Sequence, residues 1–313
     1  MATENNIHDK SYKDLFSNKD VFVKLVKNHI NSNWSDKISE ENLSLIDKSF
    51  ILEDYEKIES DIVYKANIED QDVIFYVLLE FQSSVDYSMP IRLFFYMSSI
   101  WREIVKNTEK NEFKRKDFKL PAIVPIVLYN GKEKWTTVKN LKGKINNYEI
   151  FGDSILNFEY ILLDVNRYNS KDLMEKGDIS SAIFLLDQDN DIEELLYKIR
   201  DIALYYNNLS DRDRNLIKHW LRNTVENEIV YDIENILSID KSEVNKMTSN
   251  VSKCINEHFE KAKKQGIEQG IEQGKIEIVM NLYSMGLSLE QIAEGVSLEI
   301  QKVEEIIKTK LSN

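Results

Sequence analysis

Two apolar strands joined by a polar turn stand out in the pattern of hydrophobic and polar positions. β-Branched and aromatic residues are frequent over residues 61–68, which favours a strand. A longer run, over residues 73–82, is apolar on both faces, which is typical of a central strand covered on both sides. The residues between them, 69–72, are polar turn material. The pattern therefore predicts an antiparallel hairpin.

Helical patterns lie on both sides of this hairpin. Apolar positions recur at near-helical spacing over residues 9–30, and a short helix is expected around residues 40–46. A broad apolar surface predicts another helix over residues 89–106. Pro90 would lie in the first turn of that helix, where proline is favoured.

Two more strands are predicted after this helix. Residues 122–129 are almost wholly apolar. Pro125 within them demands an edge position or a bulge, because proline donates no hydrogen bond to a sheet. Residues 160–165 form the second strand. The elements together predict an α/β fold with a mixed sheet flanked by helices.

From about residue 170 onward the strand patterns stop and helical patterns follow. We therefore expect a core over residues 1–168, a helical extension over residues 169–262 and a small helical module over residues 263–313. The fold class is thus an α/β core followed by a largely α-helical C-terminal region.

The last module contains a short repeat that places Gly266, Gly270 and Gly274 on one stripe of a helix. Each glycine costs a helix about 1 kcal/mol relative to alanine. The stripe therefore favours close packing against another helix, either in a second chain, which would make a homo-oligomer, or within the same chain. Ser288 is the expected N-cap of a further helix, and a last helix is expected over residues 298–308. We expect this helix-turn-helix-like pair to contact protein rather than read bases.

Composition excludes several classes of protein. The 313 residues carry 41 Lys and Arg against 54 Asp and Glu, a net charge of -13, and 42% of them are hydrophobic, which is a globular composition. The single Cys254 excludes a disulfide framework and a cysteine-rich zinc site. Because the sequence has no run of eighteen apolar residues and no signal-peptide core, we expect a cytoplasmic protein with no membrane partner.

The acidic charge argues mildly against a polyanionic partner, because phosphate binding draws on clustered lysine and arginine. One local cluster does occur between Lys106 and Lys119. It is either a phosphate-binding patch or a solvated surface loop.

Candidate chemistry lies at one end of the hairpin. If the two strands pair symmetrically about the peptide between residues 70 and 71, Asp61 lies opposite Glu80, and Gln82 lies on the same face as Glu80. Two opposed carboxylates destabilise a sheet unless a cation neutralises them, and Mg²⁺ binds one or two carboxylates together with phosphate oxygens. The alternative is that Asp61 begins its strand in solvent while Glu80 pairs with a lysine.

Several short blocks occur in the order found in a known family. They are His8-Asp9-Lys10-Ser11-Tyr12-Lys13-Asp14-Leu15-Phe16, Glu59-Ser60-Asp61-Ile62-Val63-Tyr64, Leu78-Leu79-Glu80-Phe81-Gln82-Ser83-Ser84, Met89-Pro90-Ile91-Arg92-Leu93, and the run from Leu120-Pro121 to Asn130-Gly131. Over residues 8–135 the chain thereby resembles the recombination-promoting nuclease (Rpn) family, whose members are also described as YhgA-like putative transposases.

The resemblance implies a PD-(D/E)XK-type nuclease core and metal-dependent hydrolysis of phosphodiester bonds in DNA, hence a Mg²⁺-dependent endonuclease. Asp61 and Glu80 would bind Mg²⁺ or another divalent cation, which polarises the scissile phosphate and lowers the pKa of a bound water. Gln82 would orient that water or contact the phosphate. Asp9 would add a third acidic group.

The sequence departs from the family's pattern at two positions. Phe81 replaces a common histidine, and Gln82 takes the place of the superfamily's usual lysine. The missing lysine removes a positive charge that would stabilise the developing phosphate charge. The alternative function is therefore a catalytically weak or inactive member that binds DNA or protein. Arg92 and Lys65 are candidate DNA contacts, and a salt bridge on the helix surface is the competing interpretation of Arg92.

Overall fold

The computed structural model describes residues 10–30, 32–46, 62–69, 71–80, 85–207, 209–225 and 230–311. Contacts within the chain divide it into two compact units, Met1–Ser249 and Asn250–Asn313. The long helix α11 (Lys241–Ser284) begins in the first unit and continues in the second.

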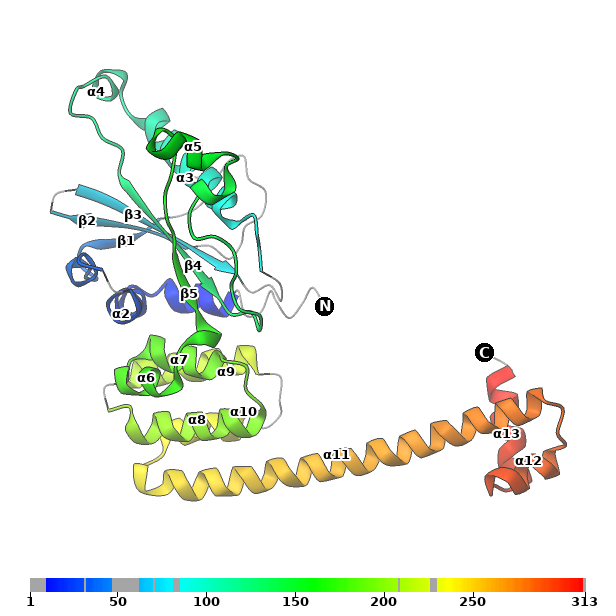
Figure 1. Ribbon diagram of the computed structural model, residues 1–313. Coiled ribbons are helices and arrows are strands. Elements are labelled where there is room, and N and C mark those ends of the chain that lie inside the picture. Colours follow the sequence, from blue (N-terminus) through cyan, green and yellow to red (C-terminus); the bar gives the residue numbers. More distant parts are fainter. Residues whose placement is uncertain are drawn as a thin grey trace. The chain divides into compact units, whose positions relative to one another are not determined.

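A mixed five-stranded sheet in the order β1-β2-β3-β4-β5 forms the centre of the first unit (Figure 1). The strands are β1 (Leu43–Leu45), β2 (Ile62–Ile68), β3 (Gln71–Glu80), β4 (Ala122–Tyr129) and β5 (Ile161–Asp164). The first three strands pair antiparallel, whereas β3, β4 and β5 run parallel to one another. The predicted hairpin, its central second strand and the mixed sheet are confirmed.

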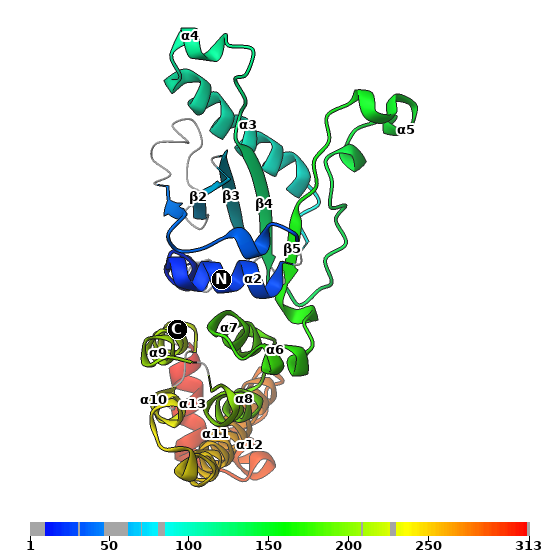
Figure 2. The same cartoon turned by 90° about the vertical axis from the view of Figure 1, so that its left-hand side faces the viewer.

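Helices cover both faces of the sheet. α3 (Met89–Asn107) lies on one face and α2 (Lys19–His29) on the other (Figure 2). On the α2 face, the ring of Phe22 stacks on Tyr64 with a centroid distance of 4.3 Å. Pro90 lies in the first turn of α3, as predicted. The core on the α3 face includes Val63, Ile74, Leu93, Tyr96, Ile100, Val127 and Tyr129.

Pro125 lies in β4 at a point where the strand has one neighbour. It pairs with Tyr76 of β3, whereas the pairing of β4 with β5 begins at Ile126. A proline is tolerated there because the strand is locally at the edge of the sheet. The predicted edge position is confirmed at this residue, although β4 as a whole lies inside the sheet.

Among the described residues after the sheet, the regular elements are all helices, as predicted. They are α6 (Ser170–Lys176), α7 (Ile179–Asp187), α8 (Ile192–Tyr205), α9 (Asp211–Thr224), α10 (Val230–Asn235), α11, α12 (Leu289–Val296) and α13 (Ile300–Leu311). Shorter elements are α4 (Lys110–Phe113), α5 (Tyr148–Phe151) and 3-10 turns at Ser35–Lys37, Lys142–Lys144, Gly152–Ser154, Val165–Arg167 and Ile236–Ser238. Across the described part of the chain, every helix is too short or too polar to cross a membrane.

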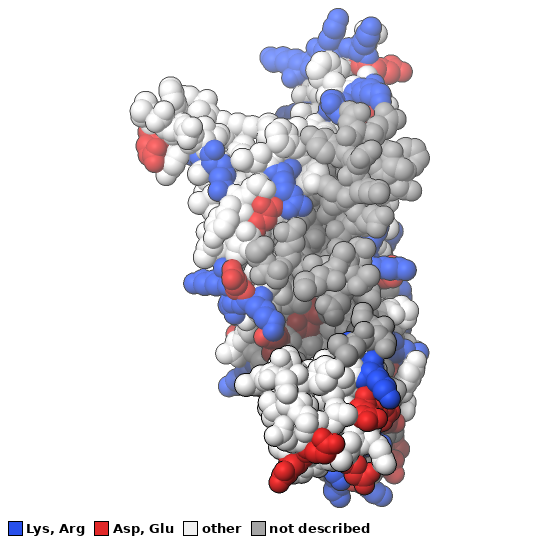
Figure 3. Space-filling model, turned by 90° about the vertical axis from the view of Figure 1, so that its right-hand side faces the viewer, with Lys and Arg blue, Asp and Glu red and all other residues white. Residues whose placement is uncertain are grey.

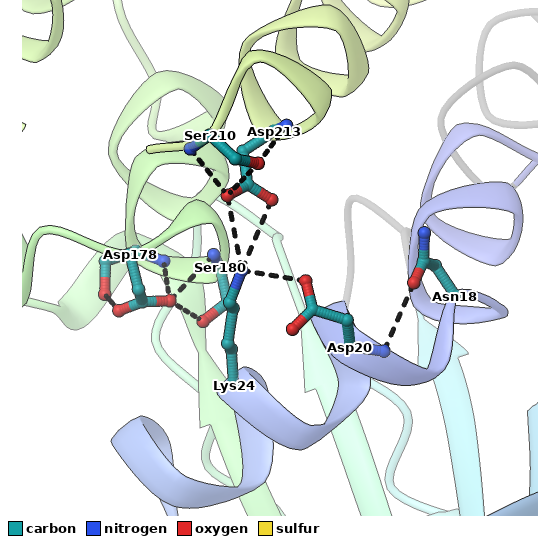
Figure 4. A network of polar contacts seen from close by, with 8 residues as sticks. Asn18, Asp20, Lys24, Asp178, Ser180, Ser210 and Asp213 are labelled. Atoms are coloured by element: carbon teal, nitrogen blue, oxygen red, sulfur yellow. Dashed lines mark hydrogen bonds and ion pairs between the residues drawn. The ribbon is translucent and has the colours of Figure 1, made fainter. Parts of the chain in front are cut away.

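A polar network joins α2 to this helical region (Figure 4). Lys24 of α2 contacts Asp20 at 2.8 Å and the buried Asp213 of α9 at 3.3 Å. Asp213 also accepts a hydrogen bond from Ser210, with which it forms a capping box. The network therefore holds the helix that covers the sheet against the helices that follow it.

In the second unit, α12 and α13 pack against the C-terminal end of α11. Ser288 is the N-cap of α12 and forms a capping box with Gln291, which confirms the predicted helix start. The shared core consists of Val279, Ile292, Ala293, Val296, Val303 and Ile307. This core uses the C-terminal end of α11, and the turns before it, around Ile271 and Ile276, line a groove together with α13.

Two predictions for the N-terminal segment are wrong. The helix expected over residues 9–30 is interrupted at Ser17 and Asn18, where the Asn18 side chain accepts a hydrogen bond from the backbone N–H of Asp20 and starts α2. The short helix expected around residues 40–46 is strand β1, which pairs with β2. The sequence pattern of this short segment is weak, so pairing with β2 and burial outweigh its own secondary-structure propensity and make it a strand.

Candidate active site

The carboxyl ends of the three parallel strands meet at one edge of the sheet. Glu80, the last residue of β3, pairs with Tyr129 at the end of β4, and Tyr129 pairs with Asp164 at the end of β5. In open α/β sheets, ligands bind outside the carboxyl ends of the strands. We call this row of strand ends the carboxyl edge, and it is the candidate active site.

Asp164 contributes a buried carboxylate oxygen to the carboxyl edge. Its Oδ1 has no hydrogen-bond partner among the described residues. Burial raises the pKa of the Asp164 carboxyl, although a hydrogen bond from the backbone N–H of Trp135 acts in the opposite direction. A buried polar atom without a partner is costly, so its presence suits a site that receives a ligand.

Asp187 ties the first helical segment to the carboxyl edge. Its Oδ2 accepts hydrogen bonds from the Tyr12 hydroxyl and from the Asn130 amide, both at 2.5 Å. Asn130 directly follows β4, and its Oδ1 accepts a hydrogen bond from Asn166 at 2.9 Å. Burial and the neighbouring Asp187 raise the pKa of Tyr12, so the phenol keeps the proton that it donates.

Gly131 lies just after the end of β4, in the turn that carries Asn130 to its hydrogen bond with Asp187. A Cβ atom on Gly131 would lie 2.0 Å from the hydroxyl oxygen of Tyr129, so only glycine fits there. A cleft beside the turn is lined by Asn130, Lys132, Asn166, Leu186, Asp187, Gln188, Asp189 and Trp220, among others. The turn therefore brings backbone and amide groups to the same end of the sheet as Asp164.

Three of the four catalytic residues predicted from the sequence lie outside the described residues. This holds for Asp9, Asp61 and Gln82. For Glu80 the structure gives the backbone, at the end of β3, and not the side chain. Their placement around a shared ion stays a prediction. Within the described ranges, no three His, Cys, Asp or Glu side chains gather in a way that could hold a metal ion.

The predicted register of the hairpin is wrong by two residues. Ile62 pairs with Val77, where the prediction would pair it with Leu79. The turn is centred one residue earlier than expected, and Glu69 adopts a φ of 53° at its start, as short hairpin turns require. Asp72, expected in the turn, belongs to β3. A shift of two residues keeps each side chain on its predicted face, but it removes the basis for placing Asp61 directly opposite Glu80.

The two candidate DNA contacts both form ion pairs within the chain. Arg92, in the first turn of α3, contacts Asp86 at 2.5 Å. Lys65 contacts Asp72 at 2.7 Å, and its strand partner Ile74 precedes Glu80 by six residues. Lys65 thus lies toward the opposite end of the hairpin from the carboxyl edge, roughly 20 Å away at about 3.3 Å per residue.

Sequence reasoning missed Asp164 and Asp187. Asp164 could have been found as an acidic residue that ends an apolar strand parallel to the one that ends in Glu80. Asp187 offered no comparable signal, because its partner Tyr12 is 175 residues away in the chain.

The fold and the carboxyl edge define an α/β protein with polar groups at the ends of three parallel strands and a helical C-terminal region. The chain belongs to the family described as "Putative transposase, YhgA-like", whose model matches residues 6–213. The resemblance drawn from the sequence is confirmed.

A curated relative is the recombination-promoting nuclease RpnD of Escherichia coli O157:H7. The chain is 23% identical to it over 129 residues, which are 41% of this chain and 47% of the relative. The aligned part thus spans about half the length of that relative. No solved structure matches the chain significantly.

Proposed function

We propose that the chain is a metal-dependent DNA endonuclease that hydrolyses phosphodiester bonds at the carboxyl edge of a PD-(D/E)XK-like core. Support comes from the family and from the name of its relative, a recombination-promoting nuclease. The observation that carries the proposal is the alignment of Glu80, Tyr129 and Asp164 at three adjacent strand ends, where an oxygen of Asp164 is buried without a partner.

Asp61 and Glu80 are the proposed ligands of Mg²⁺ or another divalent cation, and Asp164 would add a carboxylate from β5, two strands away from β3. Carboxylate oxygens suit this role because Mg²⁺ prefers hard oxygen ligands. When bound, the ion would polarise the scissile phosphate and lower the pKa of a bound water. Gln82 would orient the attacking water through its amide, and Asp9 would contribute a further acidic group.

A lysine-rich segment around α4 is the proposed contact to the DNA backbone away from the scissile bond, because this segment precedes the start of β4 and the carboxyl edge lies at the end of that strand. Arg92 and Lys65 would join it by exchanging their ion pairs with Asp86 and Asp72 for phosphates. Lysine and arginine side chains gather at the top of the view in Figure 3, where α4 lies. Four exposed lysines of this segment form no recorded ion pair with any described residue, and they are Lys110, Lys114, Lys116 and Lys119. Clustered lysines bind phosphates regardless of sequence, even on an acidic protein.

Replacing these four lysines with alanine should weaken DNA binding. The slope of log K against log salt should become shallower by about 3–4, because each phosphate contact contributes about 0.9. Fluorescence anisotropy over a series of NaCl concentrations measures both effects. The control replaces four exposed lysines from other segments, Lys171, Lys246, Lys253 and Lys310. Equal slopes for the two variants would remove this segment from the DNA interface.

A second candidate function rests on Gln82. Since glutamine supplies no positive charge to the developing phosphate charge, a weak or inactive member that only binds DNA or protein is the alternative. Such a protein would bind DNA equally well in Mg²⁺ and in EDTA and would leave it intact.

The experiment is incubation of the purified full chain with supercoiled plasmid in Mg²⁺ or EDTA. We expect nicking in Mg²⁺ and none in EDTA, and we expect Glu80→Ala to abolish it. Asp72→Ala is the matched control, because Asp72 is an acidic residue of the same strand at the end remote from the carboxyl edge. Binding without nicking by the wild type would establish the alternative.

A further inference from the structure

A cleft of about 640 Å³ lies beyond the ends of β4 and β5, between the turn that follows β5 and the helices α7 and α8 (Figure 1). It is lined by three basic and two acidic side chains, which are Lys132, Arg167, Lys198, Asp189 and Glu194. The lining is therefore net positive on a chain whose net charge is -13. Lys132 pairs with Asp189 at 2.9 Å. Arg167 and Lys198 have no recorded ion pair with a described residue, so these two cations are the ones that an anion in the cleft would meet.

Lys198 is a half-buried cation whose recorded partners are neutral. Its ammonium donates hydrogen bonds to the amide oxygens of Gln188 at 3.0 Å and Asn190 at 2.5 Å. Burial lowers the pKa of Lys198, and the charge of Glu194, one turn earlier on α8, acts in the opposite direction. A charge that is partly withdrawn from water without a counter-ion is costly, so the position suits an anionic ligand.

Arg167 supplies the second cation from the turn Val165–Arg167. Its guanidinium donates to the backbone oxygens of Lys132 at 2.6 Å and Asn166 at 3.4 Å, which holds it beside the end of β4. A guanidinium has five N–H donors, so it can keep these bonds and still bind an anion. Burial raises the pKa of Asp164, and the charge of Arg167 is among the influences that lower it. Arg167 therefore lies within electrostatic reach of the carboxyl edge.

Gln188 joins the two cations into one frame. Its amide nitrogen donates to the backbone oxygens of Val165 at 3.3 Å and Tyr168 at 2.8 Å, on either side of Arg167. Its amide oxygen accepts the hydrogen bond from Lys198. The turn that carries Arg167 and the ammonium of Lys198 are thus held together before any ligand arrives. Groups that are held in place beforehand lose less entropy on binding.

We propose that Arg167 and Lys198 bind a backbone phosphate of the DNA strand beside the phosphate that is cleaved at the carboxyl edge. The inference rests on the proposed function for the identity of the ligand. Arginine binds phosphate oxygens through paired N–H donors, and lysine adds a point charge. At about 2 Å per residue along a 3-10 turn, the Cα atoms of Asp164 and Arg167 are about 6 Å apart. A strand whose scissile phosphate lies at Asp164 therefore passes directly over the cleft.

DNA binding by the full chain in EDTA tests the site, because cleavage does not contribute there. Fluorescence anisotropy of a labelled DNA duplex over a series of NaCl concentrations gives Kd and its salt dependence. Arg167→Gln with Lys198→Met should raise Kd about tenfold and make the slope of log K against log salt shallower by about 1. Arg167→Lys with Lys198→Arg keeps both charges and should bind within about threefold of the wild type. The control, Arg212→Gln with Lys246→Met, removes two exposed charges from α9 and α11 and should change neither quantity.

Urea unfolding midpoints show whether the variants fold. If Lys198→Met does not, Arg167→Gln alone carries the test, because Arg167 is exposed, and it should still raise Kd about threefold. Weaker binding by the double variant of a chain that binds DNA without nicking it would support the phosphate site and overturn the endonuclease. A chain that nicks plasmid, with a double variant of unchanged Kd and slope, would overturn the phosphate site and leave the endonuclease standing. Equal losses in the double variant and in the control would also overturn the site.

Discussion

Beside the carboxyl edge of the first unit, buried and half-buried polar side chains are hydrogen-bonded to one another. On the middle of α11, in the second unit, apolar side chains are exposed instead. Tyr12, Asn130 and Asp187 satisfy each other, and the Asp164 oxygen lacks a partner. On α11 it is the apolar face around Gly270 that lacks one. The two regions therefore suit different partners. A carboxylate with a buried, unpaired oxygen suits a cation, and an exposed apolar helix face suits another helix.

The largest effect on stability is expected from Asp187→Ala. The Tyr12 hydroxyl and the Asn130 amide would both lose a buried acceptor, and each such loss costs about 1–3 kcal/mol. We expect the free energy of unfolding to fall by about 2–4 kcal/mol, measured by urea denaturation. Asp187→Asn retains an oxygen acceptor and should cost less. Equal losses for the two variants would show that the hydrogen bonds do not carry the effect.

On α11, by contrast, a substitution is expected to raise the free energy of unfolding. Gly266→Ala should stabilise the isolated helix by about 0.8–1 kcal/mol, because alanine has the better helix propensity and its methyl group meets open space. If α11 packs against a second copy, as the glycine stripe in the sequence predicts, the same methyl group should hold the two helices further apart and weaken a dimer. Thermal unfolding of dilute protein tests the first effect, and sedimentation tests the second. A stronger dimer would contradict close approach at the glycines.

A smaller effect concerns His29, the last residue of α2, whose ring contacts the Ser181 hydroxyl of α7 at 3.1 Å. Burial lowers its pKa to about 4, the nearby Lys176 acts in the same direction, and Asp178 opposes them. Between an unfolded pKa of about 6.5 and a folded pKa of about 4, the unfolded chain binds more protons. Stability should therefore fall as the pH drops through this window. His29→Gln should flatten that part of the pH profile, and an unchanged slope would assign it to other groups.

The sequence correctly predicted those elements that are decided by residues close together in the chain. The hairpin, α3 with Pro90 and the Ser288 cap follow from periodicity and capping chemistry within a few residues. The helix expected around residues 40–46 failed because pairing with β2 decides that segment, and a single-residue change in the turn centre shifted the register of the hairpin.

The candidate site was less predictable, because its described parts come from distant segments. Tyr12 and Asp187 come together through the packing of two helices. Asp164 becomes a candidate site residue only because β5 pairs parallel to β4, which places Asp164 beside the end of β4. Asp61, Gln82 and Asp9 came from hairpin geometry and family resemblance, and their roles stay proposals.

The most direct measurement of the central claim is the initial rate at which wild type and Asp61→Ala nick supercoiled plasmid in Mg²⁺, taken together with their unfolding midpoints. If Asp61 and Glu80 share a metal ion, the variant should lose activity to background while its midpoint stays the same. Two carboxylates close enough to share an ion repel each other in the metal-free protein, so removing one costs little stability. A variant that nicks plasmid as fast as the wild type would contradict the proposed metal site.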